Sequence, residues 1–241
     1  MTSRVPTSPE PPPPWEYHQH RFQAPPGTTE ILLIRHGESE PAIEDRPFAL
    51  IDGQGDPALS PEGRIQAQRV CARLAGQGVD AIYVTSLRRT AESAESLARA
   101  LGLDCLVEPD LREVFLGEWE GGIFRKKIAD RDPITLRMFE EQRWDVIPGA
   151  EPADVFARRL RGAVERMAAA HVDQKVAVFT HGAAIGELMA QATGSEPFAF
   201  TGADNASVSH LVITPQKWIV RRFNDTAHLD WPLPEGLELH Q

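Results

Sequence analysis

Cysteine is scarce in this sequence. Cys71 and Cys105 are the two cysteines among 241 residues, and they do not form a Cys-x-x-Cys pair. Two cysteines are too few for a disulfide framework in a chain of this length. We expect both to be buried thiols, one on a helix and one on a strand, in a protein that works in a reducing compartment.

Long apolar runs are also missing. The sequence contains no stretch of the roughly 18 apolar residues that a transmembrane helix requires. Its first residues, MTSRVPTSPEPPPPWEY, lack the apolar region of a secretory signal peptide. These two absences predict a cytoplasmic protein that has no membrane partner.

Positive charge is in deficit, because 25 Lys and Arg residues stand against 35 Asp and Glu residues, for a formal net charge of −10. Nucleic acids and anionic lipids would repel such a chain, so we expect no nucleic-acid partner. An anionic substrate would have to meet a local cluster of Arg and His. The sequence also lacks a Walker loop, a His-Glu-x-x-His motif and a Gly-x-Ser-x-Gly motif. It therefore gives no support to a nucleotide kinase, a zinc protease or a serine hydrolase.

Proline is abundant, but it gathers at the start of the chain. Eight of the 20 prolines lie in residues 1–29, and four of them form the run Pro11 to Pro14. Such a segment favours the polyproline II conformation and cannot build a packed core. We expect a proline-rich extension over residues 1–29 and one folded domain over residues 30–241. Aromatic residues in the extension would allow it to dock in part onto that domain: Trp15, Tyr17 and Phe22.

From Glu30 onward, short apolar runs alternate with helical patterns. Runs such as Ile31–Ile34 are typical of strands that are buried on both faces. Ser60-Pro61-Glu62 is typical of a helix start, with a capping hydroxyl, a proline in the first turn and an acid near the positive end of the helix dipole. We expect strands near 31–34, 81–84, 105–107, 176–179, 207–213 and 217–223. We expect helices from about 60, over 89–101 and 153–170, and around Ile185 to Met189, with less regular helical sequence up to Trp144.

This alternation predicts an α/β fold, a three-layer α/β/α sandwich around a mostly parallel sheet. One of the last two strands could run antiparallel to the others. The oligomeric state stays open.

Two buried strands are followed by the same pair of residues. The strand at 31–34 ends in Arg35-His36-Gly37-Glu38, and the strand at 176–179 ends in Thr180-His181-Gly182. In parallel α/β sheets, ligands bind beyond the carboxyl ends of the strands. Glycine lets the backbone approach a ligand closely, and Arg pairs bidentately with phosphate. Two His-Gly pairs at strand ends, one preceded by Arg, therefore indicate a phosphate site.

The segment ILLIRHGESE resembles the signature of the histidine phosphatase superfamily, which includes phosphoglycerate mutases, fructose-2,6-bisphosphatases and broad acid phosphatases. The resemblance runs over about residues 30–229 and implies the phosphoglycerate-mutase-like fold. Further segments match the family in its own order: Asp56 to Ser60 with Gln66-Ala67, Thr85 to Arg89 with Ser93-Ala94, Leu111-Arg112-Glu113 with Gly117 to Gly121, Phe179 to Gly182, Asn205 to Ser207, and Asn224 to Leu229.

The resemblance implies a role for each matching residue. His36 would be the nucleophile that becomes phosphohistidine, and Glu113 would protonate the leaving oxygen and later activate water. Arg35, Arg89 and His181 would surround the phosphoryl group. The positive charge of these residues would replace a metal, so we expect neither a metal ion nor another cofactor. Two further residues are candidates for binding the substrate: Gly182 and Gln54.

Some positions have close rivals. Arg88 competes with Arg89, and the spacing to Ser93-Ala94 favours Arg89. Glu118 and Glu120 compete with Glu113 and would otherwise be exposed. His228 lies in a matching segment, but we expect it to be structural.

Two departures bear on the reaction. Many family members carry an Asn at the position of Ala42, so loop 40–57 is expected to take a different path. The stretch between Glu113 and His181 is compact and lacks the longer insertion that mutases use to enclose a bisphosphate. Both features favour a phosphatase acting on a small phosphorylated substrate.

Two alternatives stay open. The first is a phosphoglycerate mutase that uses the same residues. The second is a weakly active scaffold that binds phosphoproteins or other partners through its proline-rich extension.

Overall fold

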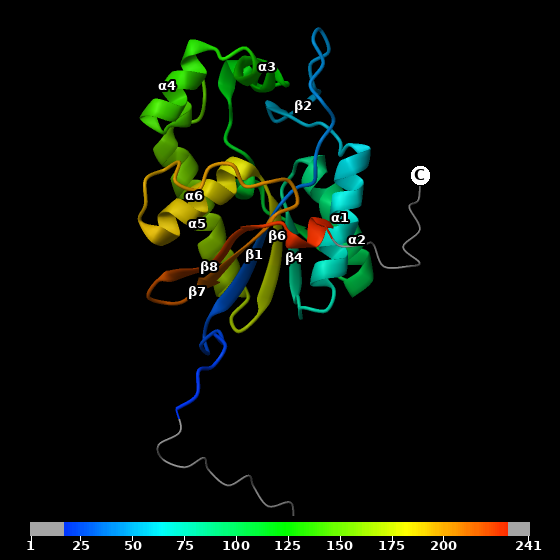
Figure 1. The fold of residues 1–241 in the computed structure, drawn as a ribbon, viewed down its shortest axis with the longest axis vertical. Coiled ribbons are helices and arrows are strands. Elements are labelled where there is room, and N and C mark those ends of the chain that lie inside the picture. The colour runs from blue at the N-terminus through cyan, green and yellow to red at the C-terminus, as the bar shows by residue number, and fades with distance from the viewer. Residues whose placement is uncertain (1–16, 231–241) are drawn as a thin grey trace, which may run out of the picture.

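A six-stranded mixed sheet forms the centre of the molecule. The computed structural model describes residues 17–230, and the sheet has the strand order β5-β4-β6-β1-β7-β8. Figure 1 shows the sheet with its helices. The strands are β1 (Thr29–Arg35), β4 (Ala81–Val84), β5 (Cys105–Val107), β6 (Lys175–Thr180), β7 (Val208–Ile213) and β8 (Trp218–Asp225). All six lie where apolar runs in the sequence predict strands, so the predicted α/β architecture is confirmed.

Strand direction follows one clear pattern. The neighbouring pairs β5-β4, β4-β6 and β6-β1 are parallel. Strand β7 runs antiparallel to β1, and β8 runs antiparallel to β7. The antiparallel strand that the sequence left open is therefore β7. It lies inside the sheet, while β8 forms the edge.

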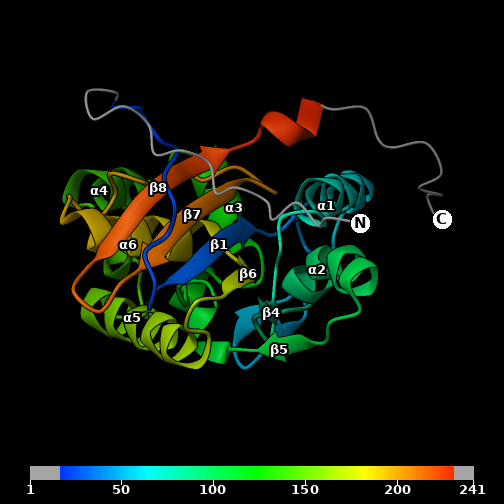
Figure 2. The same cartoon turned by 90° about the horizontal axis from the view of Figure 1, so that it is seen from below.

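Helices cover both faces of the sheet, which gives the predicted three layers (Figure 2). One face packs on α1 (Pro61–Leu74) and α2 (Arg88–Leu101), and the other on α5 (Ala153–Ala170) and α6 (Gly182–Thr193). Strand β1 feeds both cores. Ile31 and Leu33 belong to the cluster with α5 and α6, and Leu32 and Ile34 to the cluster with α1 and α2. Because successive side chains of a strand point to opposite faces, a strand that is covered on both faces must be apolar throughout.

The helix ends follow the predicted local chemistry. The hydroxyl of Ser60 accepts a hydrogen bond from the backbone N–H of Gly63 at 3.1 Å, and this bond caps the start of α1. Gly102 ends α2 in the left-handed conformation, with φ of 65°. A side-chain cap satisfies a backbone N–H that the first helical turn would leave unpaired. These two ends fix α1 and α2 beside the sheet.

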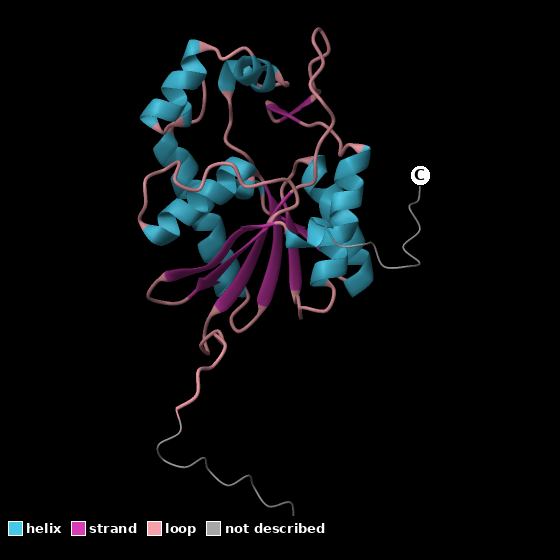
Figure 3. Ribbon diagram, in the orientation of Figure 1, coloured by secondary structure: helices cyan, strands magenta, loops and turns pink. Residues whose placement is uncertain are grey.

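A smaller unit lies over the carboxyl end of the parallel strands, at the top of Figures 1 and 3. It contains α3 (Ile123–Ala129) and α4 (Pro133–Glu141), and we call residues 115–147 the cap. The cap has its own apolar cluster, formed by Trp119, Met138, Val146 and Ile147. A short hairpin of β2 (Leu50–Ile51) and β3 (Gln54–Gly55) belongs to loop 40–57. The less regular helical sequence before Trp144 thus resolves into two short helices.

Gly37 is required by a close backbone contact with α1. A Cβ atom on Gly37 would overlap the carbonyl oxygen of Gly63, and a Cβ atom on Gly63 would overlap the carbonyl oxygen of Glu38. The two glycines let the loop after β1 lie directly against the first turn of α1. The sequence suggests that Gly37 lets the backbone approach a ligand closely. In the structure, Gly37 instead lets the backbone approach the first turn of α1 closely.

The described part of the N-terminal extension lies on the domain. The Phe22 ring packs under the guanidinium of Arg221 on β8, with 3.9 Å from Cζ to the ring centroid. Tyr17 is 90% exposed. Trp15 and the run Pro11 to Pro14 lie outside the described residues.

The two cysteines are free thiols, as expected. Cys71 is buried on α1, as predicted, but the prediction that Cys105 is buried is wrong, because it is half-buried on the edge strand β5. Burial raises the pKa of both thiols. Within residues 17–230, no helix combines the length and the apolar character that a bilayer crossing demands.

Candidate active site

His36 lies at the end of β1 and is 6% exposed. Its Nδ1 is 2.7 Å from the carbonyl oxygen of Gly37. A carbonyl oxygen can only accept, so Nδ1 carries the hydrogen and Nε2 carries the lone pair. Arg89 donates from Nε to this Nε2 at 3.2 Å. The local backbone therefore fixes one tautomer of His36, a point that the sequence left open.

The backbone around His36 is held from three elements. Its N–H donates to the carbonyl of Thr180 on β6, and its carbonyl accepts the side-chain amide of Asn205 at 3.0 Å. The N–H of Gly37 donates to the hydroxyl of Ser93 on α2 at 2.9 Å. Ser93 and Asn205 lie in segments that match the family motifs. The motif match assigns no role to either residue, and their hydrogen bonds hold the backbone around His36 in place.

Two arginines flank His36. Arg89 donates from Nη1 to the carbonyl of Gly55 at 2.9 Å, and Asp56 lies 4.0 Å from it. Burial lowers the pKa of Arg89 to about 10, so it stays charged at neutral pH. Arg35 donates from Nη1 to the carbonyl of Ala203 at 2.5 Å, and its buried Nε has no partner among the described residues. Arg88, the rival of Arg89, points outward and pairs with Glu92.

His181 occupies the N-cap position of α6, without a capping hydrogen bond from its side chain, and is fully buried. Its ring centroid lies 5.2 Å from that of His36, and its Nε2 lies 3.1 Å from the hydroxyl of Thr85. Its buried Nδ1 has no partner within the described part of the chain. Gly182, the next residue, packs against the side chain of Arg35. A Cβ atom added to Gly182 would lie 3.4 Å from the Nε of Arg35.

Glu113 reaches the same place from the loop after β5. Its carboxylate accepts three backbone N–H groups, from Val114 at 3.0 Å, Ala183 at 3.1 Å and Ala184 at 3.2 Å. The last two belong to the first turn of α6, where free N–H groups favour negative charge. The carbonyl of Glu113 accepts the side-chain amide of Gln54 at 2.8 Å. Gln54 therefore supports Glu113 from behind and is 5% exposed.

A cavity of about 250 Å³ lies beside His36, between the sheet and the cap. Four of the seven predicted residues line it: Arg35, His36, Arg89 and Glu113. His181, Gly182 and Gln54 are not among its lining residues. Glu118 is exposed, whereas Glu120 lines the cavity and accepts backbone N–H groups from Gly55 and Leu116. The expectation that Glu120 would be exposed is therefore wrong, because these two bonds draw its carboxylate inward.

The segments 40–57 and 113–150 were expected to set the specificity of the site, but the residues with which they line the cavity could not be identified from the sequence. Arg125 on α3 donates to the carbonyl of Glu40 at 2.7 Å and to the hydroxyl of Ser39 at 2.6 Å. It also packs over the ring of Phe48. The aromatic residues that line this side are Phe48, Trp119, Phe124 and Trp144. Apart from Trp119, they lie outside the matched motifs, so no motif marks them as site residues.

Both histidines of the site resist protonation. Burial and the nearby charges of Arg89 and Arg35 hold the pKa of His36 well below its usual 6.5. Burial, Arg89 and His36 do the same for the pKa of His181. A neutral imidazole keeps the lone pair that a nucleophile needs. His228, in contrast, lies outside this cavity and joins Arg73 to the carbonyl of Ala206, which is the structural role expected of it.

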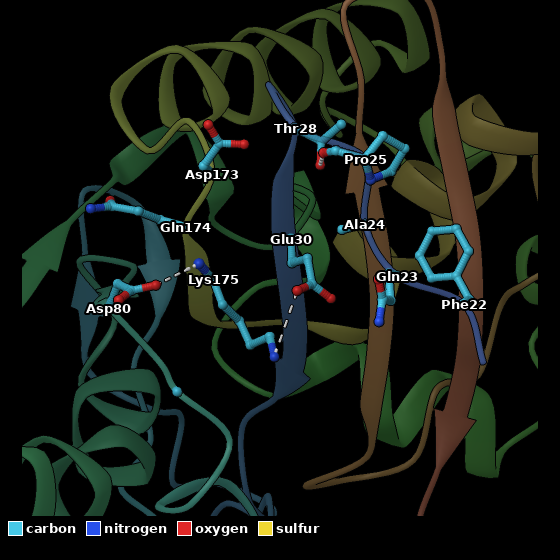
Figure 4. Close-up of a pocket in the computed structure, with 11 residues that line it drawn as sticks. Phe22, Gln23, Ala24, Pro25, Thr28, Glu30, Asp80, Asp173, Gln174 and Lys175 are labelled. Atoms are coloured by element: carbon cyan, nitrogen blue, oxygen red, sulfur yellow. Dashed lines mark hydrogen bonds and ion pairs between the residues drawn. The ribbon is translucent and has the colours of Figure 1, made fainter. Parts of the chain in front are cut away.

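Another cavity, of about 490 Å³, lies at the opposite end of β1 (Figure 4). Its charged groups already have partners, either in an ion pair or in hydrogen bonds with the backbone. The backbone N–H of Lys175 donates to Asp80 at 2.8 Å, and its ammonium lies 3.6 Å from Glu30. Asp173 accepts the N–H of Gly27. At the cavity beside His36, in contrast, the Nε2 lone pair of His36 meets the cation of Arg89, and the buried Nε of Arg35 has no partner among residues 17–230.

Within residues 17–230, no three or more His, Cys, Asp or Glu side chains are grouped so that they could hold a metal ion.

Comparison with known proteins gives consistent matches. The family model "Histidine phosphatase superfamily (branch 1)" matches residues 31–226. Phosphoglycerate mutase-like protein 4 of Arabidopsis thaliana is 32% identical over 205 residues, 83% of this chain and 87% of that protein. The metal-independent phosphoserine phosphatase of the same plant is 31% identical over 205 residues, 83% of each chain. The structure of a mycobacterial glucosyl-3-phosphoglycerate phosphatase has a TM-score of 0.70 at 26% identity, and the match covers 83% of this chain and 100% of that one.

Proposed function

Because the chain belongs to the histidine phosphatase superfamily and has its phosphoglycerate-mutase-like fold, we propose that it is a metal-independent phosphomonoester hydrolase with His36 as nucleophile. The observation that carries the proposal is the state of the His36 ring. Its Nδ1 hydrogen is held by the Gly37 carbonyl, and its Nε2 lone pair is next to Arg89 at the cavity. A fixed neutral imidazole beside buried cations suits attack on a phosphoryl group.

In the first step, Nε2 of His36 attacks phosphorus and the bond from phosphorus to the alcohol oxygen breaks. The alcohol oxygen takes a proton from Glu113 and leaves as the neutral alcohol. The Nδ1–H of His36 continues to donate to the carbonyl oxygen of Gly37. This hydrogen bond stabilises the positive charge that the phosphorylated ring acquires. Oε2 of Glu113 accepts one N–H, from Ala183, and its second lone pair can carry the proton.

In the second step, water attacks the phosphohistidine. Glu113, now a carboxylate, takes the proton of the water, and the electrons of the N–P bond return to Nε2. Inorganic phosphate leaves, and both residues regain their starting states. Arg35 and Arg89 neutralise the charge on the equatorial oxygens through both steps. The Nε of Arg35 and the Nδ1 of His181, which have no partner within residues 17–230, are suited to hold two of these oxygens.

The substrate of this reaction is a small phosphorylated compound, and the free thiols of Cys71 and Cys105 support a cytoplasmic location. The test is phosphate release by the wild-type protein from primary alkyl phosphates and 3-phosphoglycerate, with EDTA present. We expect EDTA-resistant release. Interconversion of 3- and 2-phosphoglycerate that is faster than release would assign the mutase reaction instead. Release that EDTA abolishes would refute metal independence.

The pKa of His36 provides an independent prediction. Since burial and, after it, the cationic neighbours disfavour the imidazolium, the pKa of the ring should lie below 6.5 in the free protein. Replacement of Arg89 by methionine removes one of these charges and should raise the pKa of His36. Histidine-ring NMR through a pH titration measures both values. A midpoint at or above 6.5 in the wild type, or a fall in the variant, would contradict this electrostatic description.

A further inference from the structure

Resting on the proposed phosphatase function, we propose that the alcohol half of the substrate is an uncharged, apolar, ring-sized group. It binds against an aromatic wall of the cap and loop 40–57, and the site disfavours small alcohols that carry a carboxylate. Aromatic wall here means Phe48, Trp119, Phe124 and Trp144, all of which line the cavity beside His36.

The cavity has two chemically different sides. Arg35, His36, Arg89 and Glu113 come from the carboxyl end of the sheet and from the loops and helices next to it. The other side is supplied by loop 40–57 and by the cap, which lies over that end of the sheet in Figure 1. With the phosphoryl group at His36, the alcohol must extend toward this second side.

The aromatic rings of the cap form a continuous surface. The ring centroids of Trp119 and Phe124 are 6.3 Å apart, and those of Phe124 and Trp144 are 5.9 Å apart. Val114, Leu116 and Pro57 add further apolar surface to the same cavity. Aromatic side chains bind flat apolar groups through area burial and offset or edge-to-face contacts. A small polar alcohol would leave this surface without a partner.

The charged groups on the cap side are engaged within the protein. Each carboxylate oxygen of Glu120 accepts a backbone N–H, from Gly55 at 2.8 Å and from Leu116 at 2.9 Å. Both terminal nitrogens of Arg125 donate, to the carbonyl of Glu40 and the hydroxyl of Ser39. A substrate carboxylate would have to compete for Arg125 and would lie in the same cavity as the carboxylate of Glu120.

Charge balance leads to the same class of substrate. The charge of a phosphoryl dianion is balanced by Arg35 and Arg89, the two cations beside His36. On the cap side, the positive charge of Arg125 balances the negative charge of Glu120. This leaves no net positive charge for a second anion. At about 250 Å³ the cavity is also slightly below the usual range of ligand sites, about 300–1,000 Å³, so it suits a phosphoryl group and one ring.

The experiment compares three primary alkyl esters, so that the leaving groups have similar reactivity: 2-phenylethyl phosphate, ethyl phosphate and phosphoserine. For the wild type we expect kcat/KM to be at least about tenfold higher for the phenylethyl ester than for the other two, from burial of its ring. Phe124→Ala should lower kcat/KM for the phenylethyl ester much more than for ethyl phosphate, so that most of this preference is lost. Phe139→Ala on α4 is the matched control, because Phe139 is 51% exposed and does not line the cavity.

The outcomes separate this inference from the proposed function. Hydrolysis of all three esters with equal efficiency, or with preference for phosphoserine, would overturn the inference and leave the phosphatase function standing. Equal loss on all three esters in Phe124→Ala would also overturn it. If the wild type hydrolyses none of the esters, the proposed function itself fails.

Discussion

Replacement of His36 by alanine is expected to lower kcat/KM for alkyl phosphates by at least about 10⁴-fold, because the variant has no nucleophile to split the displacement into two steps. The fold should survive, since the ring makes its two hydrogen bonds to its own neighbour Gly37 and to Arg89 and belongs to neither apolar cluster of the sheet. Steady-state phosphate release measures the loss, and circular dichroism checks the fold.

A matched control for this substitution lies on the neighbouring strand. His210 of β7 is paired in register with Leu32 of β1 and does not line the cavity. His210→Ala should therefore keep kcat/KM within about threefold of the wild-type value, which is the usual outcome for a position outside the site. If the His36 variant retained more than about a tenth of wild-type activity while folded, His36 would not be the nucleophile.

Replacement of Glu113 by glutamine should have an effect that depends on the leaving group. For alkyl phosphates, whose alkoxide must be protonated as it leaves, we expect kcat/KM to fall about 10²- to 10⁴-fold. For p-nitrophenyl phosphate, whose leaving group is stable as an anion, the phosphorylation step should lose far less. Hydrolysis of the phosphohistidine should still be slow, because the base for water is missing. A burst of p-nitrophenol followed by slow turnover would reveal both effects.

Glu118→Gln is the control for this prediction, because Glu118 is exposed in the same segment of the chain. This substitution should leave kcat/KM for the alkyl and the p-nitrophenyl ester unchanged. If Glu113→Gln lowered kcat/KM equally for the alkyl and the p-nitrophenyl ester, Glu113 would serve to hold the structure or the phosphate. The leaving oxygen would then take its proton from another group.

The strands β1, β4, β6 and β7 could be predicted because they are buried on both faces. The run Ile31–Ile34 alternates between two apolar clusters, so every position has to be apolar, and the sequence displays this directly. The direction of a strand, in contrast to its position, could not be predicted, because residues such as Leu211 and Ile213 in β7 would suit a parallel strand equally well. The antiparallel pairing of β7 with β1 depends on how the chain returns from α6, which composition does not encode.

The cap was harder to predict because its apolar pattern is mixed. On α4, Met138 is buried, whereas Leu136 is 61% and Phe139 is 51% exposed. Periodicity cannot define a helical face when apolar residues point both inward and outward. The bounds of α3 and α4 therefore emerged from the structure, and with them the positions of Arg125 and the aromatic wall.

Within the site, motif residues could be located in advance and loop residues could not. Arg35, His36, Arg89 and Glu113 line one cavity. Arg35 and His36 lie at the end of β1, and Arg89 lies on the helix that follows β4, so the neighbouring carboxyl ends of parallel strands bring these three together. Their catalytic roles stay predictions. Gln54 was proposed to contact the substrate, yet it donates to the carbonyl of Glu113, because the β2–β3 hairpin turns its side chain inward. That geometry comes from loop 40–57, whose path the sequence leaves undetermined.

The most direct test of the proposed mechanism is to trap and locate the phosphoenzyme. The protein is mixed with a radiolabelled phosphomonoester and quenched in alkali within milliseconds, and its peptides are mapped. The mechanism predicts a base-stable, acid-labile label on the peptide that contains His36, bonded through Nε2, because Nδ1 is held by Gly37. Turnover without any labelled protein, or a label on another residue, would contradict it.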